Sequence, residues 1–158
     1  GLFPGQPEGA GLDHGFEAGL TLIAGINGLG KTTILTAILR ALTGPVDVTG
    51  EGAPHALGVS VPENPVALRP KQIAFFAQRV ADGAKAAHVA LSATFGEHSL
   101  RVTRRLADLS LVECLIDGVA LPLAGARAAR EASFQTVLAD LMGLGSFIDV
   151  LLVLHHVL

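Results

Sequence analysis

The chain has few of the residue types on which several classes of protein depend. Its 158 residues include one cysteine, no tryptophan and no tyrosine, and only 16% are charged. The single cysteine, Cys114, excludes an internal disulfide framework and a zinc site built from cysteines, and we expect it to be a small core residue. The longest stretch without Asp, Glu, Lys or Arg is Ala18 to Gly30, which has 13 residues and four glycines. A membrane span needs roughly 20 apolar residues, so no membrane contact is predicted.

The apolar content excludes disorder for most of the chain. Half of the residues are apolar and the mean hydropathy is +0.53, whereas the net charge is only −3. So little charged surface indicates a lobe whose apolar faces meet a second lobe or a partner. The first 11 residues lack the basic and apolar regions of a secretion signal. We therefore expect a cytoplasmic protein, with nucleoid association as an option.

The pattern along the chain predicts one α/β lobe over residues 1–158. Alternation in the middle of the chain predicts antiparallel strands joined by hairpin turns, and apolar spacing elsewhere predicts helices. The expected elements are a loop with an unplaced strand (1–19), a buried strand (20–24), a helix from Thr32 to Gly44, a long connection (44–70), a short helix or strand (71–84), strands within 88–123, a helix (126–141) and an apolar segment (147–158).

One motif carries chemistry. Residues 25–32 read GINGLGKT, which is the pattern G-x-x-x-x-G-K-T between the expected strand and helix. Glycines at Gly28 and Gly30 let backbone N–H groups approach clustered phosphates. Lys31 is placed to reach the β- and γ-phosphates of a nucleotide, and the Thr32 hydroxyl is placed to ligate Mg²⁺. The sequence therefore predicts a phosphate-binding loop.

The segment from Gly19 to Ala37, GLTLIAGINGLGKTTILTA, resembles the first nucleotide motif of ABC-type ATPases, G-x-N-G-x-G-K-[ST]-[ST]. Within that superfamily the chain looks most like the N-terminal head lobe of the SMC and double-strand-break-repair ATPases. The expected hairpins over 88–105 and 109–123, and the helices of 126–158 leading toward a possible coiled coil, add to this likeness. The resemblance implies a P-loop ATPase lobe that contains an antiparallel hairpin region and is incomplete without a second lobe.

The resemblance also assigns roles to residues. It implies that ATP contacts a set of loop residues, with Lys31 catalytic, Thr32 on Mg²⁺ and Asn27 near the γ-phosphate; the full set is Gly25, Asn27, Gly28, Leu29, Gly30, Lys31, Thr32 and Thr33. The family has a glutamine at the end of this lobe that contacts Mg²⁺ and the attacking water. This chain has His155 and His156 at that place, and either is a candidate for the role.

Two parts of an ABC-type catalytic site are missing from the sequence. We find no signature loop and no apolar strand ending in Asp-Glu, because Asp117-Gly118 is better explained as a hairpin turn. We therefore expect ATPase activity only when a second lobe, from a missing C-terminal part or another chain, completes a head dimer. By resemblance, that assembly binds DNA in repair, chromosome maintenance or defence against foreign DNA.

Two other functions remain open. The segment Ile73–Gln78 resembles the "I-x-Y-x-x-Q" of ABC transporter domains, which would make Gln78 the water-positioning residue. A lobe that binds ATP to assemble without hydrolysis is the other alternative. The arginine cluster Arg101, Arg104 and Arg105 either contacts DNA phosphates or pairs with acids such as Glu97 and Asp108.

Overall fold

A four-stranded antiparallel sheet organises the structure, a computed structural model that describes residues 11–18, 21–26, 28, 30–49, 64–79 and 82–157. Its strands follow one another in chain order: β3 (His88–Phe95), β4 (His98–Arg105), β5 (Leu111–Ile116) and β6 (Val119–Ala120). The predicted alternation of β3 is confirmed, because successive side chains switch between exposed and half-buried positions. The sheet thus has one face for the core and one for solvent.

Turn residues fix the register of this sheet. Asp117 and Gly118 both have positive φ, 51° and 77°, which is the geometry that joins two strands with two residues. The prediction of a turn at this place is therefore confirmed. The Asp117 carboxylate also accepts hydrogen bonds from the Ser99 N–H and from His98. Those bonds hold the β5–β6 turn against the start of β4.

An irregularity in β5 explains why its burial does not alternate. Thr103 pairs with Glu113 but Arg104 pairs with Leu111, so Val112 is an extra residue on the β5 side. Val112 is consequently exposed, while Leu111 and Cys114 both face the core. The expectation that Cys114 is a small core residue is confirmed.

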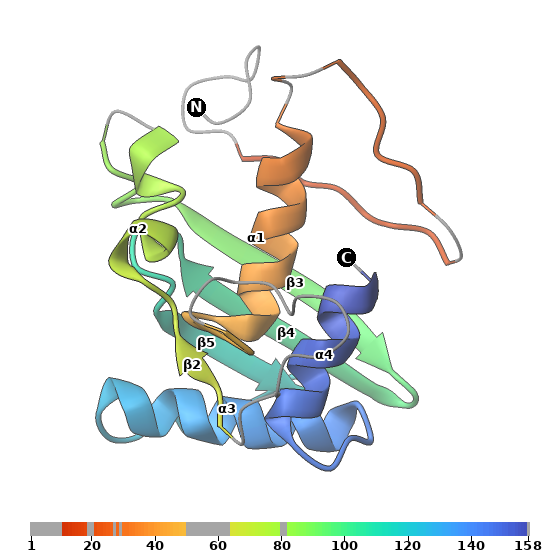
Figure 1. Ribbon diagram of the computed structural model, residues 1–158. Helices are drawn as coiled ribbons and strands as arrows, with labels where there is room; N and C mark the ends of the chain where they lie inside the picture. Colours follow the sequence, from red (N-terminus) through yellow and green to blue (C-terminus); the bar gives the residue numbers. More distant parts are fainter. Residues whose placement is uncertain are drawn as a thin grey trace.

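Three helices cover the core face of the sheet (Figure 1). They are α1 (Lys31–Thr43), α3 (Arg127–Leu141) and α4 (Phe147–Val157). Phe134 and Leu138 of α3 and Val150 and Leu151 of α4 are fully buried against apolar residues of β4 and β5. At roughly 25 cal/mol per Å² of buried apolar surface, such a core is the main stabilising term.

A buried ion pair lies inside this apolar layer. The Arg104 guanidinium is completely buried and donates to Glu131 at 2.7 Å, to the Ala41 carbonyl at 2.8 Å and to the Leu109 carbonyl at 3.1 Å. These contacts join β4 to α1, α3 and the turn before β5. One interpretation of the arginine cluster, that Arg104 contacts DNA, is therefore wrong.

The remaining elements are short. Strand β1 (Val46–Asp47) pairs with β2 (Val66–Ala67), followed by α2 (Pro70–Ile73) and a 3₁₀ turn at Ala77–Arg79. Phe76 is buried with Leu68, Leu106 and Leu109 in a second apolar cluster. Among the described helices, none has both the length and the apolar content needed to cross a bilayer.

The predicted buried strand at residues 20–24 is wrong for the part that the structure describes. Residues 21–26 have no regular secondary structure and Leu22 is 84% exposed. Figure 1 shows them as an extended arm that runs away from the four-stranded sheet. A strand needs a neighbour to pair its N–H and C=O groups, and in the described ranges both sheets form without this segment. The last strand, β6, ends at Ala120, whereas the predicted hairpin extends to residue 123.

Candidate nucleotide site

The phosphate-binding motif lies where the extended arm meets α1. Gly30 is the residue before the helix and has a left-handed conformation, φ 84°, and Gly28 has φ 90°. Residues with a Cβ rarely adopt these angles, so glycine is required for the turn that leads into the helix. The helix begins at Lys31 with no side-chain cap, which leaves N–H groups of its first turn free for an anion.

The Lys31 side chain folds back into the concave side of the loop. Its Nζ donates hydrogen bonds to the Gly25 carbonyl at 2.6 Å and to the Ile26 carbonyl at 2.8 Å. The loop therefore curves around an ammonium group rather than running straight past it. This arrangement places the one strong positive charge of the motif beside the free N–H groups at the start of α1.

The other predicted loop residues are distributed around this centre. Thr32 is exposed in the first turn of α1, and Thr33 is half-buried and lines a cavity of 580 Å³. That cavity lies between residues 11–16, α1 and β3, and one of its lining side chains is Phe16, which contacts the His14 ring edge-to-face. Asn27 and Leu29, which the resemblance includes, lie outside the described residues.

Of the candidates for the missing glutamine role, the structure describes the side chains of His155 and Gln78. His155 Nε2 bonds to the Asp47 carboxylate, which is completely buried and also accepts 2.8 Å bonds from Arg40 and from the Val48 N–H. This ring is therefore committed at the opposite end of α1 from Lys31. Gln78 lies exposed at the 3₁₀ turn. The side chain of His156 is outside the described part.

The Arg40–Asp47–His155 network ties three elements together. It joins the last turn of α1, strand β1 and the end of α4 through one carboxylate. Burial alone would raise the pKa of Asp47. Hydrogen bonds from His155 and Arg40, together with the Arg40 charge, lower it by a larger amount, so the net pKa is below its ordinary value. No spacing in the sequence connects residues 40, 47 and 155, so sequence reasoning missed this network.

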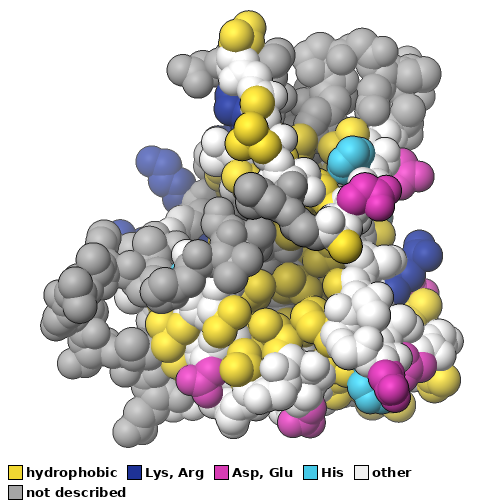
Figure 2. Space-filling view, turned by 90° about the vertical axis from the view of Figure 1, so that its right-hand side faces the viewer, with side chains coloured by type: hydrophobic (Ala, Val, Ile, Leu, Met, Phe, Trp, Pro, Cys, Tyr) yellow, Lys and Arg dark blue, Asp and Glu magenta, His cyan; other side chains and the backbone are white. Residues whose placement is uncertain are grey.

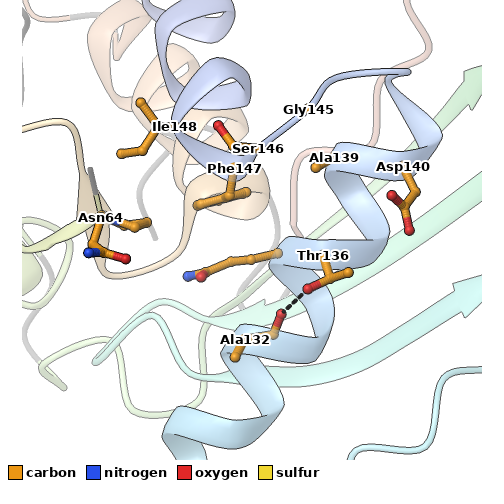
Figure 3. Close-up of a pocket in the computed structure, with 11 residues that line it drawn as sticks. Asn64, Ala132, Thr136, Ala139, Asp140, Gly145, Ser146, Phe147 and Ile148 are labelled. Atoms are coloured by element: carbon orange, nitrogen blue, oxygen red, sulfur yellow. Dashed lines mark hydrogen bonds between the residues drawn. The ribbon is translucent and has the colours of Figure 1, made fainter. Parts of the chain in front are cut away.

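Elsewhere the structure places no competing catalytic constellation in the ranges it describes. A cavity of 320 Å³ lies between α3 and α4 (Figure 3), where the Thr136 hydroxyl donates to the Ala132 carbonyl and Ser146 donates to Asp149. The Asp149 N–H donates back to the Ser146 hydroxyl, so this pair caps the start of α4. The described residues also contain no group of three His, Cys, Asp or Glu side chains suited to a metal.

Comparison with known families points to the same segment. Residues 13–65, about a third of the chain, match the family model of an AAA domain. The match supports a P-loop ATPase-type domain. It spans the arm, the loop, α1 and β1, and thus every loop residue predicted from the sequence. No curated protein and no solved structure matches the chain.

Proposed function

We propose that this chain is the ATP-binding lobe of an SMC-like ATPase, in which nucleotide binding and hydrolysis by paired heads are coupled to DNA binding. The observation that carries the proposal is the loop curved around Lys31, with its ammonium held by two backbone carbonyls at the start of α1. Lys31, the free first-turn N–H groups and the Thr32 hydroxyl fit a Mg²⁺-bound triphosphate in charge and in donor type.

The chain's own residues would perform the binding step. Lys31 exchanges the Gly25 and Ile26 carbonyls for phosphate oxygens, and its ammonium then offsets the charge of the β- and γ-phosphates. Thr32 supplies a hydroxyl ligand for the metal, and Thr33 lies between the loop and the 580 Å³ cavity. ATP would supply the phosphoanhydride bond that is hydrolysed.

One feature favours completion by a second lobe, namely exposed apolar side chains. Leu22 and Ile26 are 84% and 75% exposed, and Figure 2 shows apolar side chains along the projecting segment and across the middle of that face. Exposure of large apolar side chains in one region is typical of a surface that another lobe covers. We propose that this lobe brings the signature loop and the Asp-Glu strand, that the assembly is a cytoplasmic head dimer, and that it acts in repair, chromosome maintenance or defence.

The antiparallel sheet of residues 88–120 supports this proposal over a transporter domain, because in a transporter domain a helical region would occupy that part of the chain. The exposed position of Gln78 does not favour the transporter function either. A lobe that binds ATP without turnover differs from the proposal only in hydrolysis. ATP hydrolysis by the complete assembly therefore separates these two functions.

The direct test is the effect of Mg-ATP on thermal unfolding of this chain. At 100 times its Kd a ligand stabilises the folded state by about 2.7 kcal/mol, which raises the Tm of a domain of this size by roughly 5 to 10 °C. Lys31→Ala removes the charged phosphate contact, so we expect most of this shift to disappear. Lys85→Ala removes an exposed lysine of the 82–86 turn and should retain the full shift. An equal shift in Lys31→Ala and Lys85→Ala would refute the assignment.

A further inference from the structure

A second hollow with a positive rim neighbours the 580 Å³ cavity, because His88 lines both, but it includes no residue of the loop at Lys31. It has a volume of 540 Å³ and is formed by the start of β3, the end of β4, the turn that follows it, the start of β5 and the first turn of α3. Three of its lining residues are arginines: Arg105, Arg127 and Arg130. Residues 105 and 127–130 are far apart in the sequence, so the pattern along the chain gives no sign of the cluster.

The charges of this hollow are not balanced by its own acids. Glu131 is buried and already neutralised by Arg104, which leaves Asp108 as the one accessible carboxylate among the lining residues. The three arginine charges and the one Asp108 charge leave the hollow with a net charge of +2, although the chain as a whole has a net charge of −3. The hollow is therefore a local positive site on an acidic chain.

Asp108 occupies only part of the hydrogen-bonding capacity of these arginines. Arg105 donates to its two carboxylate oxygens at 3.0 and 2.8 Å. Arg127 donates through Nη2 to the Asp108 backbone carbonyl at 2.5 Å, and its Nη1 lies 3.6 Å from Oδ2. Arg130 donates only through Nε, to the Gly125 carbonyl at 3.1 Å. In the described part of the chain, the terminal nitrogens of Arg130 and Nη1 of Arg105 have no protein acceptor. The side chains of Arg105 and Arg127 are 46% and 50% exposed, so a ligand can reach them.

The position of two of these arginines is locally unfavourable. Arg127 and Arg130 lie in the first turn and just after it, at the positive end of the α3 dipole, and that turn contains no acidic residue. Cations at this end destabilise a helix, whereas an anion beside them would be stabilised. Locally unfavourable choices of this kind are expected at functional sites.

From this arrangement we propose that the hollow binds a phosphate group, separately from the loop at Lys31. Planar guanidinium groups donate in pairs to phosphate oxygens, and three of them face one cavity. The phosphate is either a diester of a DNA backbone or a free anion such as pyrophosphate. With DNA as its source, the site deepens the proposed function by naming the surface that contacts the nucleic acid.

The test measures binding of a fluorescent 20-base-pair duplex to the full chain by anisotropy, at several salt concentrations. Arg127→Ala/Arg130→Ala should weaken binding at least tenfold and reduce the slope of log K against log salt by about 0.9 per lost phosphate contact. Asp108→Asn should strengthen binding, because it removes the opposing charge. Arg101→Ala is the matched control, since Arg101 is exposed on β4 but does not line the hollow.

Isothermal titration with pyrophosphate distinguishes the two phosphate sources. Loss of pyrophosphate binding in Arg127→Ala/Arg130→Ala, without duplex binding by the unmodified chain, supports the site with a free anion as its ligand. The pyrophosphate titrations are made in a Lys31→Ala background, so that the loop at Lys31 does not contribute to the signal. The Mg-ATP shift of the unmodified chain is a separate readout, so a failed nucleotide proposal and a failed phosphate proposal give different results. Unchanged duplex and pyrophosphate binding in the double variant would overturn the proposal. Weaker binding in Asp108→Asn would also overturn the proposal. This second variant tests the proposal even if the double variant does not fold.

Discussion

Gly44 is a position in the described part of the chain where one added methyl group has a large and predictable cost. It follows α1 with φ 63° and ψ −144°, a region that only glycine commonly adopts. A Cβ at this position would lie 2.9 Å from both Cζ and Nη1 of Arg104 and 3.0 Å from Nη2. The methyl group of Gly44→Ala would therefore strain the backbone and displace a completely buried guanidinium.

The two contributions can be given magnitudes. Backbone strain in this region costs about 1 to 3 kcal/mol. Displacing Arg104 weakens its pairing with Glu131, and breaking a buried pair of this kind outright costs about 3 to 5 kcal/mol. Partial relaxation lowers the second figure, so we expect Gly44→Ala to reduce the free energy of unfolding by about 3 kcal/mol or more. This is a large part of the roughly 5 to 15 kcal/mol that stabilises a typical domain.

Urea unfolding followed by circular dichroism measures this loss, with Gly143→Ala as the control. Gly143 also follows a helix with φ 66°, but an added Cβ there meets no atom within 4 Å. The control should show only the strain, and the difference between the variants reports the contact with Arg104. In an Arg104→Met/Glu131→Leu background, Gly44→Ala should cost no more than the control. A loss below about 1 kcal/mol in the unmodified background would refute the reasoning, because strain alone would exceed it.

Two further predictions concern titration and reactivity. The pKa of Asp47 is lower in the folded chain than in the unfolded one, so its contribution is full above the unfolded value near 4 and is lost as the pH falls through the lowered folded value. Asp47→Asn should flatten the acid limb of a stability-against-pH curve, and an unchanged limb would contradict this. Burial raises the pKa of the Cys114 thiol, so a thiol reagent at neutral pH should modify it only in denaturant. Rapid modification in the native state would show that the strand is open.

Local pattern predicted the parts of the fold that depend on near neighbours. The Asp117-Gly118 turn, the alternation of β3 and the helix ending at Gly44 are all encoded within a few residues, and all three are confirmed. The predicted buried strand at 20–24 failed because a strand depends on a neighbour, which a local window does not reveal. The apolar run has the composition of a buried strand, but no neighbouring strand pairs with its backbone in the described part of the chain.

The residues of the candidate sites also fall into those that are close in the sequence and those that come together only in the fold. Lys31 and Thr32 were predicted from spacing alone, because the loop chemistry is contiguous in the sequence. Asp47 with His155, and Arg105 with Arg127, were missed because they come together only through packing of distant elements. The sequence did favour the pairing of Arg105 with Asp108 as one explanation of the arginine cluster, and the structure confirms that pair.

The chain order of the sheet has a kinetic consequence. Each of β3 to β6 pairs with the strand next to it in the sequence, so closing these hairpins fixes only short loops of chain. Contacts of low sequence separation form early and set fast folding, whereas the α1 loop adds no strand to this sheet. We therefore expect the hairpin region to form early in folding, and substitutions in the phosphate-binding loop to leave the rate of its formation unchanged.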